Sequence, residues 1–110
     1  MFVNCAGGNF PRVITLGREL TRRGRDVTVL GHAQQRPQAE AAGSEFVANS
    51  NAPSWCPAGR RAPRPHCGGY LARVTTRTLA DDAVAASRAA NLVAADCMLL
   101  PVMSALNALP

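Results

Sequence analysis

Short apolar runs alternate with segments of helical spacing over the first 48 residues. Three of these runs are too short for helices and predict buried strands, namely Met1–Cys5, Val27–Leu30 and Ser44–Ala48. A longer periodic segment separates the first two strands, and an alanine-rich helix is expected at Gln35–Ala42, ended by Gly43. Strands joined by helices in this order form parallel crossover units. Residues 1–48 therefore predict a βαβαβ unit.

The first helix is expected to begin at Pro11 and to end before Gly24. Proline suits the first helical position because its missing N–H would have no partner there. The apolar face is expected to carry residues at helical spacing, namely Val13, Ile14, Leu16, Gly17 and Leu20. Arg22 and Arg23 place positive charge at the negative end of the helix dipole. Gly24 then supplies the left-handed residue that commonly ends a helix.

Regular periodicity is absent from residues 49–77, a loop rich in proline, arginine and glycine. Its prolines, which interrupt any helix or strand, are Pro53, Pro57, Pro63 and Pro65. Three interpretations stay open: a functional loop, a flexible linker, or a run that a shifted reading of a GC-rich gene produces. No site residue is assigned to this loop.

The remaining segment, residues 78–110, predicts an αβα unit. Thr78 and Asp81 are spaced as a variant of the capping box that starts a helix. The face of this helix toward the sheet is expected to consist mainly of small residues, Leu79, Ala83, Ala86, Ala90 and Val93. Val93–Leu100 is expected to be the fourth strand, followed by a last helix from Pro101. The residues of this last helix that point inward are expected to be Val102, Leu106 and Leu109.

These patterns together predict a single α/β domain spanning residues 1–110, a Rossmann-like parallel sheet with helices on both faces. All 12 basic residues are arginines, and the net charge is +5. The arginines are scattered and do not alternate with aromatic residues, so no nucleic-acid partner is expected. No apolar run reaches the length of a transmembrane segment, and no signal-peptide pattern is present, so a cytoplasmic location is expected.

The four cysteines are Cys5, Cys56, Cys67 and Cys97. None belongs to a C-x-x-C pair, and the first and last lie in strand-like runs where cysteine behaves as a small apolar residue. Cys56, His66 and Cys67 do not have the spacing of a zinc knuckle. No metal site is therefore expected.

Gly7 and Gly8 stand between the first strand and the first helix, where glycines often bind phosphate. The Walker motif G-x-x-x-x-G-K-[ST] requires a lysine, which the chain lacks. The dinucleotide fingerprint requires G-x-G-x-x-G and an acidic residue after the second strand, whereas Gly31 and His32 occupy that position. No nucleotide cofactor is therefore expected, although an anion at the helix N-terminus stays open.

The segment "AGGNFPRVITLGRELTRRGRDVTVLGH" resembles the N-terminal motif of B-type-fold glycosyltransferases, which glycosylate natural products and lipids from nucleotide sugars. The matching residues are Gly7, Pro11, Leu16, Leu20, Arg23, Gly24, Val27 and Val29. The segment "AADCMLLPVMSALNALP" resembles the later strand–aspartate–helix segment of the same family. The resemblance implies that the chain is a truncated half of the acceptor-binding N-terminal domain of such an enzyme.

The family mechanism implies roles for individual residues. A histidine in the first turn acts there as general base on the acceptor hydroxyl, and an aspartate on the later strand orients it. Asp96 stands at the position of the catalytic aspartate, whereas Gly8 stands at the position of the histidine. The acceptor-binding residues implied by the match are Gly7, Gly8, Asn9 and Phe10. Asn9 does not replace the base, because a neutral amide accepts no proton at neutral pH.

Two residues also have alternative interpretations. His32 either reaches the same edge of the sheet as the first turn, or it is a helix-capping or solvent-exposed residue. Asp96 can equally cap the helix predicted to start at Pro101, and this structural role is compatible with the catalytic one.

The family binds its nucleotide-sugar donor with a C-terminal domain that has no counterpart in these 110 residues. The isolated chain is therefore expected to bind a hydroxylated small-molecule or lipid acceptor but to be inactive. The alternative function is a non-enzymatic, Rossmann-like binding or interaction module. Self-association through an exposed sheet edge is expected in that case.

Overall fold

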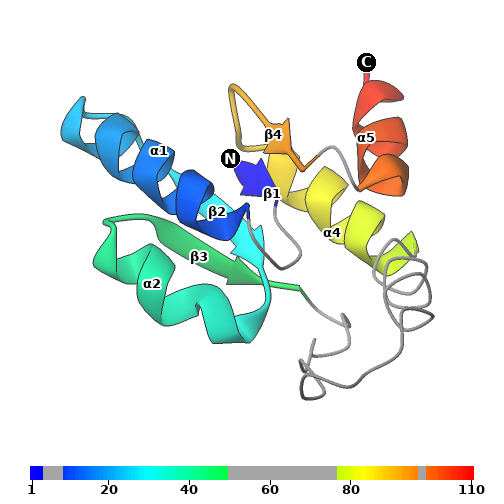
Figure 1. The fold of residues 1–110 in the computed structure, drawn as a ribbon. Helices are drawn as coiled ribbons and strands as arrows, with labels where there is room; N and C mark the ends of the chain where they lie inside the picture. The colour runs from blue at the N-terminus through cyan, green and yellow to red at the C-terminus, as the bar shows by residue number, and fades with distance from the viewer. Residues whose placement is uncertain (4–8, 50–76, 97–98) are drawn as a thin grey trace, which may run out of the picture.

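The computed structural model describes residues 1–3, 9–49, 77–96 and 99–110. Its elements in chain order are β1 (Phe2–Val3), α1 (Phe10–Arg22), β2 (Thr28–Gly31), the 3₁₀ turn η1 (Ala33–Gln35), α2 (Arg36–Ala41), β3 (Glu45–Ala48), α4 (Arg77–Ser87), β4 (Ala94–Ala95) and α5 (Leu100–Asn107) (Figure 1). Most of the predicted loop, Gly7, Gly8 and all four cysteines lie outside the described residues.

The four strands form one parallel sheet in the order β3-β2-β1-β4. The register aligns side chains of neighbouring strands into two rows that point to opposite faces. One row consists of Phe46, Val29, Phe2 and Ala94, and the other of Val47, Leu30, Val3 and Ala95. The predicted α/β class is thus confirmed for the described residues, with a parallel sheet compatible with the Rossmann-like class.

Each row of side chains packs against different helices (Figure 1). The buried cluster on the face of α1 and α2 contains Phe2, Phe10, Val27, Val29, Ala39 and Phe46. The cluster on the face of α4 and α5 contains Val3, Leu30, Leu79, Ala83, Leu99 and Val102. Burying one such large apolar side chain stabilises the fold by about 1.5–3 kcal/mol. The prediction of helices on both faces of the sheet is therefore confirmed.

Helix α1 follows the predicted pattern with one exception. It begins at Phe10, one residue before its predicted start, and Gly24 has a φ of +74°, as expected for a left-handed stop. Leu16 was expected on the buried face, but it is 50% exposed, so that prediction is wrong. Gly17 is buried, as predicted, and it allows α1 to approach Ser44 closely, because a Cβ there would lie 3.2 Å from Ser44 Oγ.

The predictions for the second segment are less accurate. Helix α4 begins at Arg77, so Thr78 lies inside the helix and does not cap it. The same helix ends at Ser87, so Ala90 and Val93 lie beyond it. Helix signals from small residues extend past the true end because alanine is compatible with both helix and loop.

Strand β4 contains only Ala94 and Ala95, instead of the predicted Val93–Leu100. Among the described residues its partner is β1, of which the structure describes Phe2 and Val3, so the described ladder is two residues long. Helix α5 then begins at Leu100 and ends at Asn107, which leaves Leu109 outside the helix and 39% exposed. The predicted inward position of Leu109 is therefore wrong.

Alanine substitutions at two glycines separate backbone strain from side-chain contact. Gly24 and Gly43 both have positive φ, +74° and +81°, but a Cβ at Gly24 would meet nothing within 4 Å, whereas one at Gly43 would lie 3.1 Å from Thr21 Cγ2. We expect Gly24→Ala to lower the free energy of unfolding by about 1–2 kcal/mol and Gly43→Ala to lower it further. Denaturant unfolding of the 110-residue chain measures both, and equal losses would contradict a cost from the Thr21 contact.

Glu19 contributes to the stability of the native state in a pH-dependent way at the end of α1. Its carboxylate accepts hydrogen bonds from Arg22 and Arg23, and these bonds lower the pKa of Glu19 from its ordinary value. A carboxyl with a lowered folded pKa stabilises the native state above its unfolded pKa, and the contribution is lost as pH falls through the folded value. We expect acid to lower the melting temperature less in Glu19→Gln than in the unmodified chain, with Asp26→Asn as a surface control. An identical acid dependence in both chains would contradict this contribution.

Candidate functional site at the β1–β4 switch point

The order of the strands defines where a ligand site is expected. The chain proceeds from β1 to β2 and β3 on one side, and then places β4 on the other side of β1. Open parallel sheets bind ligands outside the carboxyl ends of their strands, at the point where the order reverses. In this chain that point lies between β1 and β4.

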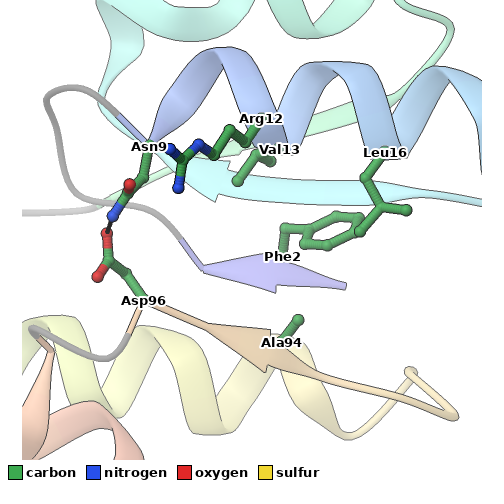
Figure 2. Close-up of a pocket in the computed structure, with 7 residues that line it drawn as sticks. All are labelled: Phe2, Asn9, Arg12, Val13, Leu16, Ala94 and Asp96. Atoms are coloured by element: carbon green, nitrogen blue, oxygen red, sulfur yellow. Dashed lines mark hydrogen bonds between the residues drawn. The ribbon is translucent and has the colours of Figure 1, made fainter.

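Asn9 and Asp96 meet at this switch point (Figure 2). Asp96 follows β4, and its backbone N–H donates to the carbonyl of Val3 at the end of β1, at 3.1 Å. Asn9 directly precedes α1 as its N-cap residue. Its side-chain Nδ2 donates to Asp96 Oδ2 at 3.0 Å, across a sequence separation of 87 residues.

The first turn of α1 has few backbone donors left for an anion. Pro11 has no N–H, and the N–H groups of Arg12 and Val13 both donate to the carbonyl of Asn9, at 3.1 and 3.2 Å. The Asn9 side chain does not cap the helix but contacts Asp96 instead. Of the first three helical residues, Phe10 alone has an N–H outside these bonds, so the described first turn of the helix is poorly suited to bind phosphate.

A groove runs beside α1 from this hydrogen bond along the sheet. We call it the α1 groove; its lining residues are Phe2, Asn9, Arg12, Val13, Leu16, Ala94 and Asp96, and its volume is about 330 Å³. Asn9, Arg12 and Asp96 lie at one end, and the apolar residues lie along the rest of it (Figure 2). The volume lies at the lower limit of the roughly 300–1,000 Å³ typical of small-molecule sites.

The register of the sheet explains why this groove exists. Ala94 continues the row of Phe46, Val29 and Phe2 on the face of α1 and α2. The described helices on this face pack over the first three members of the row, whereas Ala94 is exposed. The groove is therefore bounded by α1 on one side, with Phe2 and Ala94 along its base.

Arg12 supplies the positive charge of the α1 groove. It extends from the first turn of α1 toward the end of the groove where Asn9 and Asp96 lie (Figure 2). Arg22, Arg23 and Arg36 each pair with a glutamate. Arg12 has no ion pair with any residue that the structure describes, and its side chain is exposed.

The structure brings together two of the site residues predicted from sequence, Asp96 and Asn9. Phe10 lies in the core, is 5% exposed and does not line the α1 groove. Its predicted contact with an acceptor therefore stays a prediction. Gly7 and Gly8 lie outside the described residues. Arg12 was missed, although its position three residues after Asn9 on one helix places both at the same end of that helix.

His32 has the capping role that was one of its two interpretations. It is the N-cap residue of η1, and its backbone N–H donates to Gln35 Oε1 at 2.9 Å. The residue is 7% exposed and does not line the α1 groove, so the solvent-exposed variant of that interpretation is wrong. The alternative role of Asp96 as a helix cap is also wrong, because the N-cap residue of α5 is Leu99.

The chemistry available at the α1 groove is hydrogen bonding and charge pairing rather than metal binding. Among the described residues, no group of three or more His, Cys, Asp or Glu side chains could hold a metal ion. The residues Cys56, His66 and Cys67 lie outside the described ranges. Within those same ranges, no helix combines the length and the apolar character that crossing a membrane requires.

Comparisons of the chain with protein-family models, curated proteins and solved structures return no match. The fold and the site define an α/β protein with a polar pair, Asn9 and Asp96, at the switch point of a parallel sheet. Any narrower assignment depends on the residues themselves.

The capping role of His32 can be tested through its partner. Replacing Gln35 with alanine leaves the buried His32 N–H without its acceptor, and we expect the free energy of unfolding to fall by about 1 kcal/mol. Gln35→Glu keeps an acceptor oxygen in the same place and should recover most of this loss. If both variants are equally unstable in denaturant unfolding, the hydrogen bond does not explain the loss.

Proposed function

We propose that the chain is the acceptor-binding part of a glycosyltransferase with the B-type fold. The family reaction transfers a sugar from a nucleotide sugar to a hydroxylated small molecule or lipid. The observation that carries the proposal is the hydrogen bond between Asn9 and Asp96, at the switch point and at the polar end of the α1 groove. The two sequence segments that resemble the family each supply one of these residues.

In this proposal Asp96 accepts a hydrogen bond from the acceptor hydroxyl. A carboxylate has about four lone-pair positions, so it can accept the Asn9 bond and a second bond from a ligand. The Asn9 amide fixes the direction of the carboxylate, because its Nδ2 donates to Oδ2 at 3.0 Å. Asp96 therefore orients and polarises the hydroxyl that attacks the sugar.

The arrangement that we propose contains no strong general base. The family histidine corresponds to Gly8, and Asn9 cannot accept a proton at neutral pH. His32 is held in its turn by Gln35 and does not line the α1 groove. The isolated chain is therefore proposed to bind an acceptor without transferring sugar, and the nucleotide-sugar donor would bind a separate domain.

Complementation with a donor domain tests this function. The 110-residue chain is mixed with a separately expressed C-terminal domain of a B-type enzyme, nucleotide sugars and a panel of hydroxylated acceptors. We expect no turnover by the chain alone and measurable transfer by the mixture. Asp96→Asn should lower transfer by on the order of 100-fold, because it removes the carboxylate that orients the acceptor hydroxyl. Gly8→His should raise transfer by a similar factor, because it supplies a general base.

The matched control is Asp26→Asn, which removes an exposed carboxylate away from the α1 groove. It should leave the transfer rate unchanged. Turnover by the chain alone, or equal rates for the two aspartate variants, would contradict the proposal.

A non-enzymatic interaction module is the second candidate. β4 is an edge strand of the described sheet, and four of the five exposed large apolar residues that the structure describes lie in the C-terminal segment: Leu92 just before β4, Leu100 and Met103 on α5, and Leu109 after α5. A second cavity of about 390 Å³ lies between the ends of α4 and α5. Size-exclusion chromatography distinguishes the two candidates, because a stable homodimer that no donor domain activates would favour the module.

A further inference from the structure

We infer that the α1 groove selects an acceptor that carries a carboxylate beside its hydroxyl, attached to an apolar and preferably aromatic body. This inference rests on the proposed function and names the class of its substrate. In such a 2-hydroxy acid, the hydroxyl and the carboxylate lie at one end of the molecule and the apolar body lies at the other. The groove has the same division, with Asp96 and Arg12 at one end and apolar residues along the rest. Arg12 is the specificity-determining residue.

The charges at the polar end lead to this assignment. Among the described residues that line the groove, Arg12 and Asp96 are the charged ones, and Asn9 stands beside both. Asp96 accepts a hydrogen bond from a hydroxyl but repels a carboxylate, whereas Arg12 is a planar donor that matches carboxylate geometry. A ligand with both groups at one end therefore satisfies both residues, while a neutral alcohol leaves Arg12 without a ligand partner.

The apolar part of the groove determines the chemical character of the rest of the ligand. Phe2, Val13, Leu16 and Ala94 line this part, and none of them offers a side-chain hydrogen bond. Leu16 is 50% exposed although it is large and apolar, and a ligand ring would cover it. Phe2 lies at the base, where an aromatic ligand can approach its ring edge-on or offset.

Direct binding to the 110-residue chain tests the inference without any transfer step. The probes are phenyllactate, its methyl ester, and phenylpropanoate, which keep the aromatic body and remove the charge or the hydroxyl in turn. Binding is followed by the amide NMR shifts of Asn9, Arg12 and Val13. We expect phenyllactate to bind with a dissociation constant on the order of 1 mM, about tenfold tighter than either analogue.

Substitution of Arg12 isolates its contribution. Arg12→Gln should weaken phenyllactate binding about tenfold and leave the affinity of the methyl ester unchanged, so that the preference for the acid disappears. Arg18→Gln is the matched control, because Arg18 is an exposed arginine of the same helix and does not line the groove. It should preserve the preference. Thermal unfolding of both variants checks that each is folded.

Several outcomes would overturn the inference. Equal affinities for acid and ester, an unchanged preference in Arg12→Gln, or shifts outside the α1 groove would each do so. Shifts at the groove that depend on protein concentration alone would assign it to a second copy of the chain and would also overturn the inference.

The binding experiment tests the inference and the transfer experiment tests the proposed function, and either result can be negative without the other. Transfer to neutral acceptors only, in the complemented assay, would support the proposed function and overturn the inference. Selective binding of phenyllactate without any transfer would support the inference and count against the proposed function.

Discussion

The backbone hydrogen bonds that join β4 to β1 include those from Ala94 N–H to the carbonyl of Met1 at 2.9 Å and from Asp96 N–H to the carbonyl of Val3 at 3.1 Å. They fix the register of a strand pair in which the structure describes two residues on each side. A slip of one residue would turn Ala94 to the opposite face and move Asp96 away from Asn9. The arrangement of the site therefore depends on the register of its shortest strands.

The α1 groove also depends on how firmly α1 is held to the sheet. Phe10 is buried directly after Asn9, and Gly17 allows the helix to approach Ser44 without a clash. These contacts hold the first turn of the helix, from which Asn9 and Arg12 extend. The polar end of the groove is thus built on a rigid element, whereas its opposite apolar end is partly open to solvent at Leu16.

Periodicity predicted β2, α2 and β3 to within one residue, because each is set by local turn and apolar signals. The length of β4 was not predictable in this way, since it depends on a partner strand at the other end of the chain. The resemblance placed Asn9 and Asp96 in one site, but local sequence cannot reveal their contact across 87 residues. Arg12 was missed because an arginine on a helix is usually a solvated surface charge.

The first turn of α1 clarifies how this fold can recognise an anion. In dinucleotide-binding folds a glycine-rich turn and the free N–H groups of the helix hold the pyrophosphate along the helix axis. Here Pro11 removes one donor, and Asn9 accepts the N–H groups of Arg12 and Val13 through its backbone carbonyl. Among the described residues, the positive group at this end of the groove is the side chain of Arg12, which lies beside Asn9. In the inferred complex, an anion would therefore be recognised in the groove and not on the helix axis, and Asp96 would add the second requirement of a hydrogen-bond donor.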